Sequence, residues 1–183
     1  SNIADFPNIK YYRVWDLAHS EKQRMKDDPD WTSGTLLGFR YVNNVLELWI
    51  KNVVRIRAKA PERDNLIREK KKKDGPSVVI GVESSLDSKD AVSIMAAILK
   101  GKRVVREIKT KGDKVARMSY LEPVFDAGNV HILSDTWNFD WEKELKEFPS
   151  GAHDDQVDNL SAGFVLFDNN KHKEIGHIQL SGV

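Results

Sequence analysis

Residues 77–82 (SVVIGV) form a short apolar run that follows Gly75-Pro76 and leads directly into Glu83. A run of this length is too brief for a helix and is typical of a buried strand. A buried strand needs other layers of structure to cover it. The run therefore predicts that the chain folds around a covered sheet and that Glu83 lies at the end of a strand.

The segments around this run alternate between strand and helix patterns. Strands are predicted at residues 9–17, 32–42, 45–56, 103–108 and 130–133, and Asn43-Asn44 suits a tight hairpin turn because asparagine tolerates positive φ. Helices are predicted at residues 61–73, 88–100, 111–127, 137–148 and 153–168, with Pro123 expected to kink or divide the third. This order predicts an α/β fold: a mixed sheet of antiparallel hairpin strands plus parallel strands, flanked by helices on both faces.

A chain of 183 residues suffices for one domain with a sizeable core and is short for two. We expect residues 1–183 to form one domain, in which residues 1–8 are an expression remnant or linker and residues 170–183 a tail. Ser1-Asn2 suggests a piece excised from a longer protein.

Several classes of protein are excluded by what the sequence lacks. It has no run of eighteen apolar residues and no signal-peptide pattern, which predicts a cytoplasmic protein without a membrane span. It has no cysteine, and this excludes disulfides, thiol catalysis and a cysteine-ligated zinc or iron–sulfur site.

The net charge of +1 hides a strong division along the chain. Residues 51–117 hold 19 Lys and Arg against 9 Asp and Glu, whereas the remainder holds 10 against 19. A basic middle between acidic ends suits a protein that binds a polyanion on one surface and concentrates carboxylates elsewhere. The alternative is a set of solvated lysine-rich helix faces, to which we assign residues 70–73, although these lysines could add nonspecific DNA affinity.

Acidic residues stand at three places bounded by hydrophobic structure. Asp16 ends the first predicted strand, and Glu83 ends the apolar one. Asp154, Asp155 and Asp158 open the last predicted helix, where spacings of three and four residues bring them to one face. Repulsion among these carboxylates is costly unless a cation or a proton neutralises it.

Oxygen ligands of this kind suit hard divalent ions such as Mg²⁺. Two ions about 4 Å apart can activate a water molecule and stabilise the leaving 3′ oxygen of a phosphodiester, without a nucleophilic side chain. The alternative treats each acid separately: Asp154 and Asp155 as helix-capping charges, Asp16 as a turn residue and Glu83 as a cap of the next helix. Spacing alone does not decide between these readings.

Six stretches of the chain, taken in order, resemble the C-terminal nuclease domain of the large terminases of tailed phages and prophages. They are residues 13–16 (RVWD), 28–34 (DPDWTSG), 80–83 (IGVE), 112–117 (GDKVAR), 127–130 (AGNV) and 148–158 (FPSGAHDDQVD). The last stretch, of the form FPxGxHDDxxD, is the most specific of them.

The resemblance implies an RNase H-like fold and a metal-dependent endonuclease that cleaves double-stranded, concatemeric viral DNA during genome packaging. It also implies two Mg²⁺ or Mn²⁺ ions bound by Asp16, Glu83 and an acid of the last motif. Among these acids we favour Asp155, then Asp158, with Asp154 as a supporting charge.

The resemblance suggests further roles outside the acidic set. Lys114 and Arg117 match the basic part of the family pattern and are predicted to contact phosphates, with a solvated helix face as the alternative. His153 is predicted either to position substrate or water or to sit in the cap region of the helix. Asp30 either approaches the site from its loop or serves the turn beside Pro29.

The implied partners are double-stranded DNA, an N-terminal ATPase domain of the parent protein, the small terminase subunit and the portal, in the cytoplasm of a bacterial host. The phosphate-loop pattern GxxxxGK[S/T] does not occur in the chain, so we expect no ATP hydrolysis by it. Two rival functions remain: a Holliday-junction resolvase or ribonuclease H, and a non-catalytic nucleic-acid-binding or assembly module with structural acids.

Overall fold

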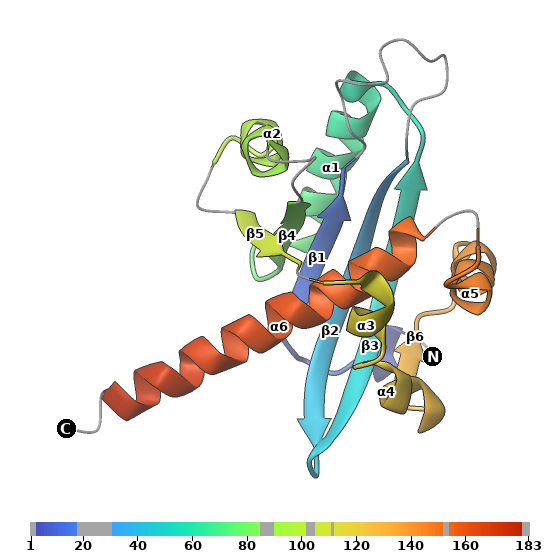
Figure 1. The fold of residues 1–183 in the computed structure, drawn as a ribbon. Coiled ribbons are helices and arrows are strands. Elements are labelled where there is room, and N and C mark those ends of the chain that lie inside the picture. The colour runs from blue at the N-terminus through green and yellow to red at the C-terminus, as the bar shows by residue number, and fades with distance from the viewer. Residues whose placement is uncertain are drawn as a thin grey trace.

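The computed structural model describes residues 3–17, 31–84, 90–101, 105–110, 112–151 and 154–180, the last ten of these by their backbone alone. Asp30 and His153, two of the predicted site residues, lie outside this part of the chain. Within it, six strands form one sheet in the order β5-β4-β1-β2-β3-β6 (Figure 1). The strands are β1 (Tyr11–Asp16), β2 (Thr32–Val42), β3 (Val45–Ile56), β4 (Val79–Ser84), β5 (Val105–Lys109) and β6 (Val130–Ile132).

The sheet is mixed, as predicted. Strands β1, β2 and β3 pair antiparallel. Strands β4 and β5 extend the sheet in parallel on the β1 side, and β6 joins β3 in parallel on the other side. The hairpin between β2 and β3 turns at Asn43 and Asn44, whose φ angles of 51° and 64° confirm the predicted positive-φ turn.

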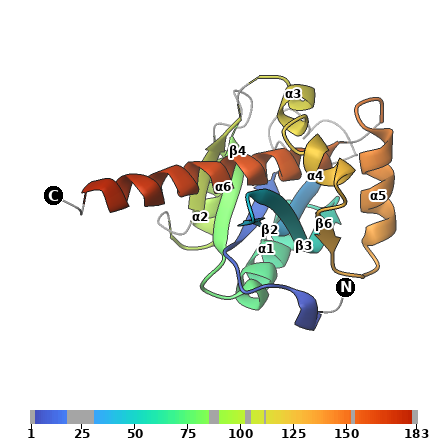
Figure 2. The ribbon, with the colours of Figure 1, turned by 90° about the horizontal axis from the view of Figure 1, so that it is seen from below.

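Helices cover both faces of the sheet, which confirms the predicted architecture. The helices are α1 (Ala60–Asp74), α2 (Ala91–Ile98), α3 (Lys114–Met118), α4 (Glu122–Asp126), α5 (Asn138–Glu147) and α6 (Asp155–Leu180), with a short 3-10 helix η1 (Ile3–Asp5) near the start. Figure 2 shows α6 and α1 on opposite sides of the sheet. None of the helices in the described ranges combines the length and the apolar character that a membrane span requires.

Two predicted helix bounds are wrong. Residues 111–127 were expected to form one helix disturbed at Pro123, but α3 ends at Met118 and Pro123 lies in the first turn of α4. Proline is tolerated there because a first-turn residue has no helical partner for its missing N–H. The last helix does not end at residue 168 but continues to Leu180, beyond the sheet (Figure 1), because no proline interrupts residues 169–180.

Alternation along β1 and β4 divides the core into two layers. Tyr12 and Val14 of β1 pack in the layer under α6, whereas Trp15 packs with Ile80 and Val82 of β4 in the layer under α1 and α2. Residues that alternate with Trp15 and Val82 therefore face α6. These are the positions of Asp16 and Glu83.

Glycine allows α6 to lie close to the sheet. A Cβ atom built at Gly163 of α6 would stand 2.7 Å from Cδ1 of Leu37 in β2, and one at Gly81 of β4 would stand 2.7 Å from Cδ2 of Leu166 in α6. Both distances are shorter than van der Waals contact, so neither position accommodates a larger side chain without movement. The close approach fixes the height of α6 above β1, β2 and β4.

Candidate functional site

Asp16 and Glu83 lie side by side at neighbouring strand ends. Trp15 pairs with Val82 in the parallel register of β1 and β4, so the next residue of each strand, Asp16 and Glu83, is also adjacent. Asp16 ends β1 as predicted, whereas Glu83 lies within β4, which continues to Ser84. Both side chains face the helix α6, as their alternation with the core requires.

The first turn of α6 is held over the same part of the sheet by buried hydrogen bonds. Ser33 of β2, which pairs with Asp16, donates its hydroxyl to the backbone oxygen of Asp155 at 3.1 Å. Asn159 of α6 donates its side-chain amide to the Ser33 hydroxyl at 2.8 Å, and both residues are fully buried. The acids of α6 are thereby positioned above Asp16.

The four predicted catalytic carboxylates are near enough to repel one another. Burial raises the pKa of Asp16 well above its ordinary value, and Glu83, Asp155 and Asp158 raise it further. Burial also raises the pKa of Asp158 to about 6, with Glu83 adding to the shift and Lys114 opposing it. The fold therefore gathers acids that are far apart in sequence into one cluster with a shared electrostatic field.

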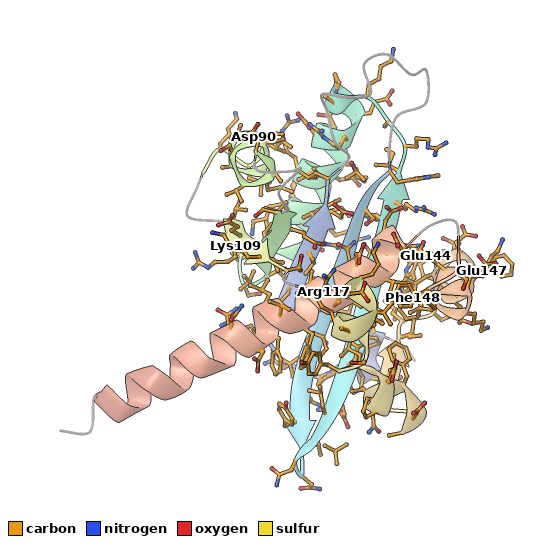
Figure 3. All side chains as sticks on the ribbon, in the orientation of Figure 1. Asp90, Lys109, Arg117, Glu144, Glu147 and Phe148 are labelled. Atoms are coloured by element: carbon orange, nitrogen blue, oxygen red, sulfur yellow. The ribbon has the colours of Figure 1, made fainter. Side chains whose placement is uncertain are left out.

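Helix α3 brings two cations to this cluster. Lys114 contacts Asp154 directly, and its Nζ lies 3.1 Å from Oδ2 of Asp158. Although burial opposes it, contact with these two carboxylates raises the pKa of Lys114. Arg117, labelled in Figure 3 where α3 lies against α6, places Nη2 3.4 Å from Oδ1 of Asp158 and 3.9 Å from Oε1 of Glu83.

Asp155 and Glu83 also contact groups outside the acidic cluster. Asp155 accepts from Nη2 of Arg55 at 2.8 Å, and Glu83 accepts from the hydroxyl of Thr110 at 2.5 Å. Among the described residues, no three Asp, Glu or His side chains converge as they stand on one ion position.

The chemistry of the donor set nevertheless fits a hard divalent cation. All of the candidate ligands are carboxylates, which Mg²⁺ and Mn²⁺ prefer to nitrogen or sulfur. Burial first, and then the negative charges of Glu83, Asp155 and Asp158, raise the pKa of Asp16, and Lys114 only partly opposes them. A divalent ion at this place would meet ligands of the right type after side-chain rotations.

Glu144 of α5 is a structural member of the site that the sequence did not suggest. It is only 5% exposed, and its Oε1 accepts from the backbone N–H groups of Gln156 and Val157 at 2.7 and 3.3 Å (Figure 3). Its Oε2 accepts from the side chain of Gln156 at 2.7 Å and lies 3.7 Å from Arg55. Glu144, and not Asp154 or Asp155, thus provides these cap hydrogen bonds in the first turn of α6.

Glu144→Ala is expected to lower the free energy of unfolding by about 1–3 kcal/mol, because it leaves buried N–H groups of α6 without acceptors. Urea denaturation followed by circular dichroism measures the change. Glu147→Ala is the matched control, since Glu147 is half-exposed and forms only a surface pair with Lys143. Equal losses in the two variants would show that Glu144 does not cap the helix.

The metal-free protein is expected to lose stability relative to Asp158→Asn as the pH rises from 4 to 7. The pKa of Asp158 is about 6 in the folded chain and near 3.8 in the unfolded chain, so the folded state holds this proton more tightly. That advantage for folding is full at low pH and is lost as the carboxyl ionises, a change of about 2–3 kcal/mol.

Urea titrations in EDTA at several pH values measure this difference. A difference between wild type and Asp158→Asn that stays constant with pH would contradict the assignment. Mn²⁺ at neutral pH should restore the stability of the wild type, because it binds the ionised cluster of the folded state alone.

Comparison with known proteins identifies the fold. No known family profile matches the sequence, and no curated protein sequence matches it. The structure is similar to the nuclease domain of the large terminase g2p of bacteriophage SPP1, solved with bound Mn, with a TM-score of 0.54 and 14% identity over 88% of this chain and 87% of that one. It is also similar to the Mn-soaked, inhibitor-bound terminase nuclease domain of human cytomegalovirus, with a TM-score of 0.50 and 12% identity over 88% of this chain and 81% of that one.

A third similar structure is the resolvase of fowlpox virus in complex with Holliday junction DNA, with a TM-score of 0.49 and 12% identity over 87% of this chain and 97% of that one. The chain thus has the RNase H-like mixed α/β fold expected from the sequence. Within that fold it is similar to terminase nuclease domains, as the sequence motifs indicated.

Proposed function

We propose that this protein is a divalent-metal-dependent endonuclease that cleaves double-stranded viral DNA during genome packaging. The observation that carries the proposal is the register of β1 and β4, which sets Asp16 beside Glu83 beneath the acids of α6. The likeness to two terminase nuclease domains, both studied with Mn, supports it. The two strand-end acids and the helix acids are the elements that such chemistry requires.

In this proposal Asp16, Glu83 and Asp155 hold Mg²⁺ or Mn²⁺, with Asp158 as a further ligand and Asp154 as a supporting charge. The cations, of which we propose two, supply the activation of water and the stabilisation of charge at the phosphodiester. The protein's part is to hold its carboxylates in place: Ser33 and Asn159 fix the α6 end, and the strand register fixes the other.

Nearby basic groups supply contacts to the DNA backbone. Lys114 and Arg117 lie at the edge of the acidic cluster, from which they can reach a phosphate. Phosphate contacts of this kind confer affinity without sequence preference. We extend the proposal to a parent protein with an ATPase motor, working with a small subunit and a portal in a bacterial host.

The test measures whether the purified chain cleaves four nucleic-acid substrates: supercoiled plasmid, linear duplex DNA, a four-way DNA junction and an RNA–DNA hybrid. Each is incubated with Mn²⁺, with Mg²⁺ and with EDTA. We expect nicking and linearisation of plasmid with either metal and none in EDTA. Preferential cleavage of the junction or the hybrid would favour a resolvase or a ribonuclease H. Absence of both cleavage and Mn²⁺ binding would favour the non-catalytic module.

A further inference from the structure

The acids of the candidate site are neutralised in this structure by the protein's own cations. Lys114 touches Asp154 and Asp158, and Arg117 touches Asp158 and Glu83. The contacts with Asp158 and Glu83 use carboxylate oxygens that the proposed function assigns to a divalent ion, and the contact with Asp154 uses the acid that it assigns as a supporting charge. An ion and the two side chains therefore compete for the same oxygens.

The two cations differ in how firmly they are held. The Lys114 side chain is 37% exposed, and both of its partners among the described residues belong to the acidic cluster. Arg117 is 13% exposed and is also tied outside the cluster, since Nη1 donates to the backbone oxygen of Gly112 at 2.9 Å and Nε to the hydroxyl of Ser161 at 3.4 Å. Lys114 can move into solvent without breaking other contacts, whereas Arg117 cannot.

The helix that carries both residues is anchored independently of them. Met118, the last residue of α3, is 8% exposed and packs in the core layer under α6. A rotation of the Lys114 side chain alone, on its flexible four-carbon stem, is enough to clear the carboxylates. No movement of α3 is needed.

We propose that Lys114 is an exchangeable internal counter-cation, which neutralises the acids of α6 in the metal-free protein and is displaced when a divalent ion binds. The inference rests on the proposed function of the same site. Arg117 stays in place as a permanent neighbour of Asp158. The displaced ammonium group of Lys114 then faces solvent at the edge of the site, where a DNA phosphate is its natural partner.

This exchange couples metal binding to DNA binding. In the metal-free state the Lys114 charge is committed to two carboxylates, so it contributes little to DNA affinity. Once an ion takes the carboxylates, the same charge becomes available to the polyanion. Lys114 thereby lowers the affinity for the metal ion. It also favours an order in which the metal ion binds first and DNA second.

Isothermal titration of Mn²⁺ into the purified chain at pH 8 tests the exchange. Lys114→Met is expected to bind Mn²⁺ about three- to tenfold more tightly than the wild type, because two partly exposed ion pairs no longer have to be broken. Lys114→Arg should bind it much as the wild type does. Lys143→Met is the matched control, because it removes one charge from an exposed pair with Glu147 on α5 and should leave Mn²⁺ affinity unchanged.

The outcomes separate the inference from the proposed function. If neither the wild type nor Lys114→Met binds Mn²⁺, the proposed metal site fails. If both bind it but Lys114→Met binds equally or more weakly, the exchange is wrong and Lys114 instead supports the site. Should Lys114→Met fail to fold, Lys114→Gln is to be titrated in its place, with the same two results deciding.

Discussion

Asp16→Asn and Glu83→Gln are each expected to reduce metal-dependent DNA cleavage by about a thousandfold or more, with little loss of DNA retention at low salt. Each substitution replaces the charged carboxylate of one proposed metal ligand by a neutral amide and keeps the size of the side chain. The basic residues that we propose to contact DNA are unchanged, so we expect binding to survive. Plasmid nicking in Mn²⁺ and gel retardation in EDTA measure the two effects.

Stability separates this loss from misfolding. Burial and three neighbouring carboxylates raise the pKa of Asp16, so its ionised form destabilises the metal-free fold at neutral pH. Asp16→Asn should therefore melt at the wild-type temperature or above it while it fails to cut. Asp126→Asn, an exposed acid on α4, is the charge-matched control and should cut normally. Wild-type rates in both Asp16→Asn and Glu83→Gln would show that the acids are misassigned.

Arg13→Leu is expected to lower the free energy of unfolding by about 3–5 kcal/mol. Arg13 is 1% exposed and forms a two-pronged ion pair with Asp74, at 2.7 Å from Nε and 2.8 Å from Nη2. Its Nη1 donates to Asn52 and to the backbone oxygen of Gly34. The pair joins the centre of the sheet to the end of α1, and its rupture leaves Asp74 charged and buried without a partner.

Urea denaturation measures the loss, and two further variants interpret it. Arg13→Leu combined with Asp74→Leu should recover much of the stability, because no unpaired buried charge remains. Arg40→Leu breaks a pair with Glu47 at the surface of the hairpin and should cost no more than about 1 kcal/mol. If Arg13→Leu is as mild as Arg40→Leu, the buried pair is not a determinant of stability.

The fold was predictable wherever local chemistry decides the conformation. The Asn43-Asn44 turn needs positive φ, and the strands on either side, β2 and β3, occupy the predicted residues. The division between α3 and α4 was not predictable, because Pro123 suits the first turn of a helix as well as the kink of one. The extension of α6 past Asp168 was missed because the hydrophobic periodicity used for the prediction ends at Phe167.

The sequence predicted which acids lie close together in the candidate site, but it did not predict which residues hydrogen-bond to them. Asp16 and Glu83 were recognisable because each follows a hydrophobic run of the sequence, and the parallel register of β1 and β4 brings them together. The bonds from Arg55 to Asp155 and from Glu144 to α6 join segments that only the folded packing brings together. Glu144 offered one local sign, its position three residues after the buried Trp141 on the same face of α5.

The packing of Gly163 in the core affects where the acids of the proposed site lie. Helix α6 carries acids in its first turn and also packs at the centre of the larger core. The distance of those acids from the strands therefore depends on how closely the helix packs against Leu37 at Gly163. A methyl group added at Gly163, as in Gly163→Ala, lies about two helical turns from Asp155 and would shift the first turn of α6 away from the sheet. The placement of the acids in the proposed site thus depends on apolar packing positions, such as Gly163 and Leu37, that lie outside it.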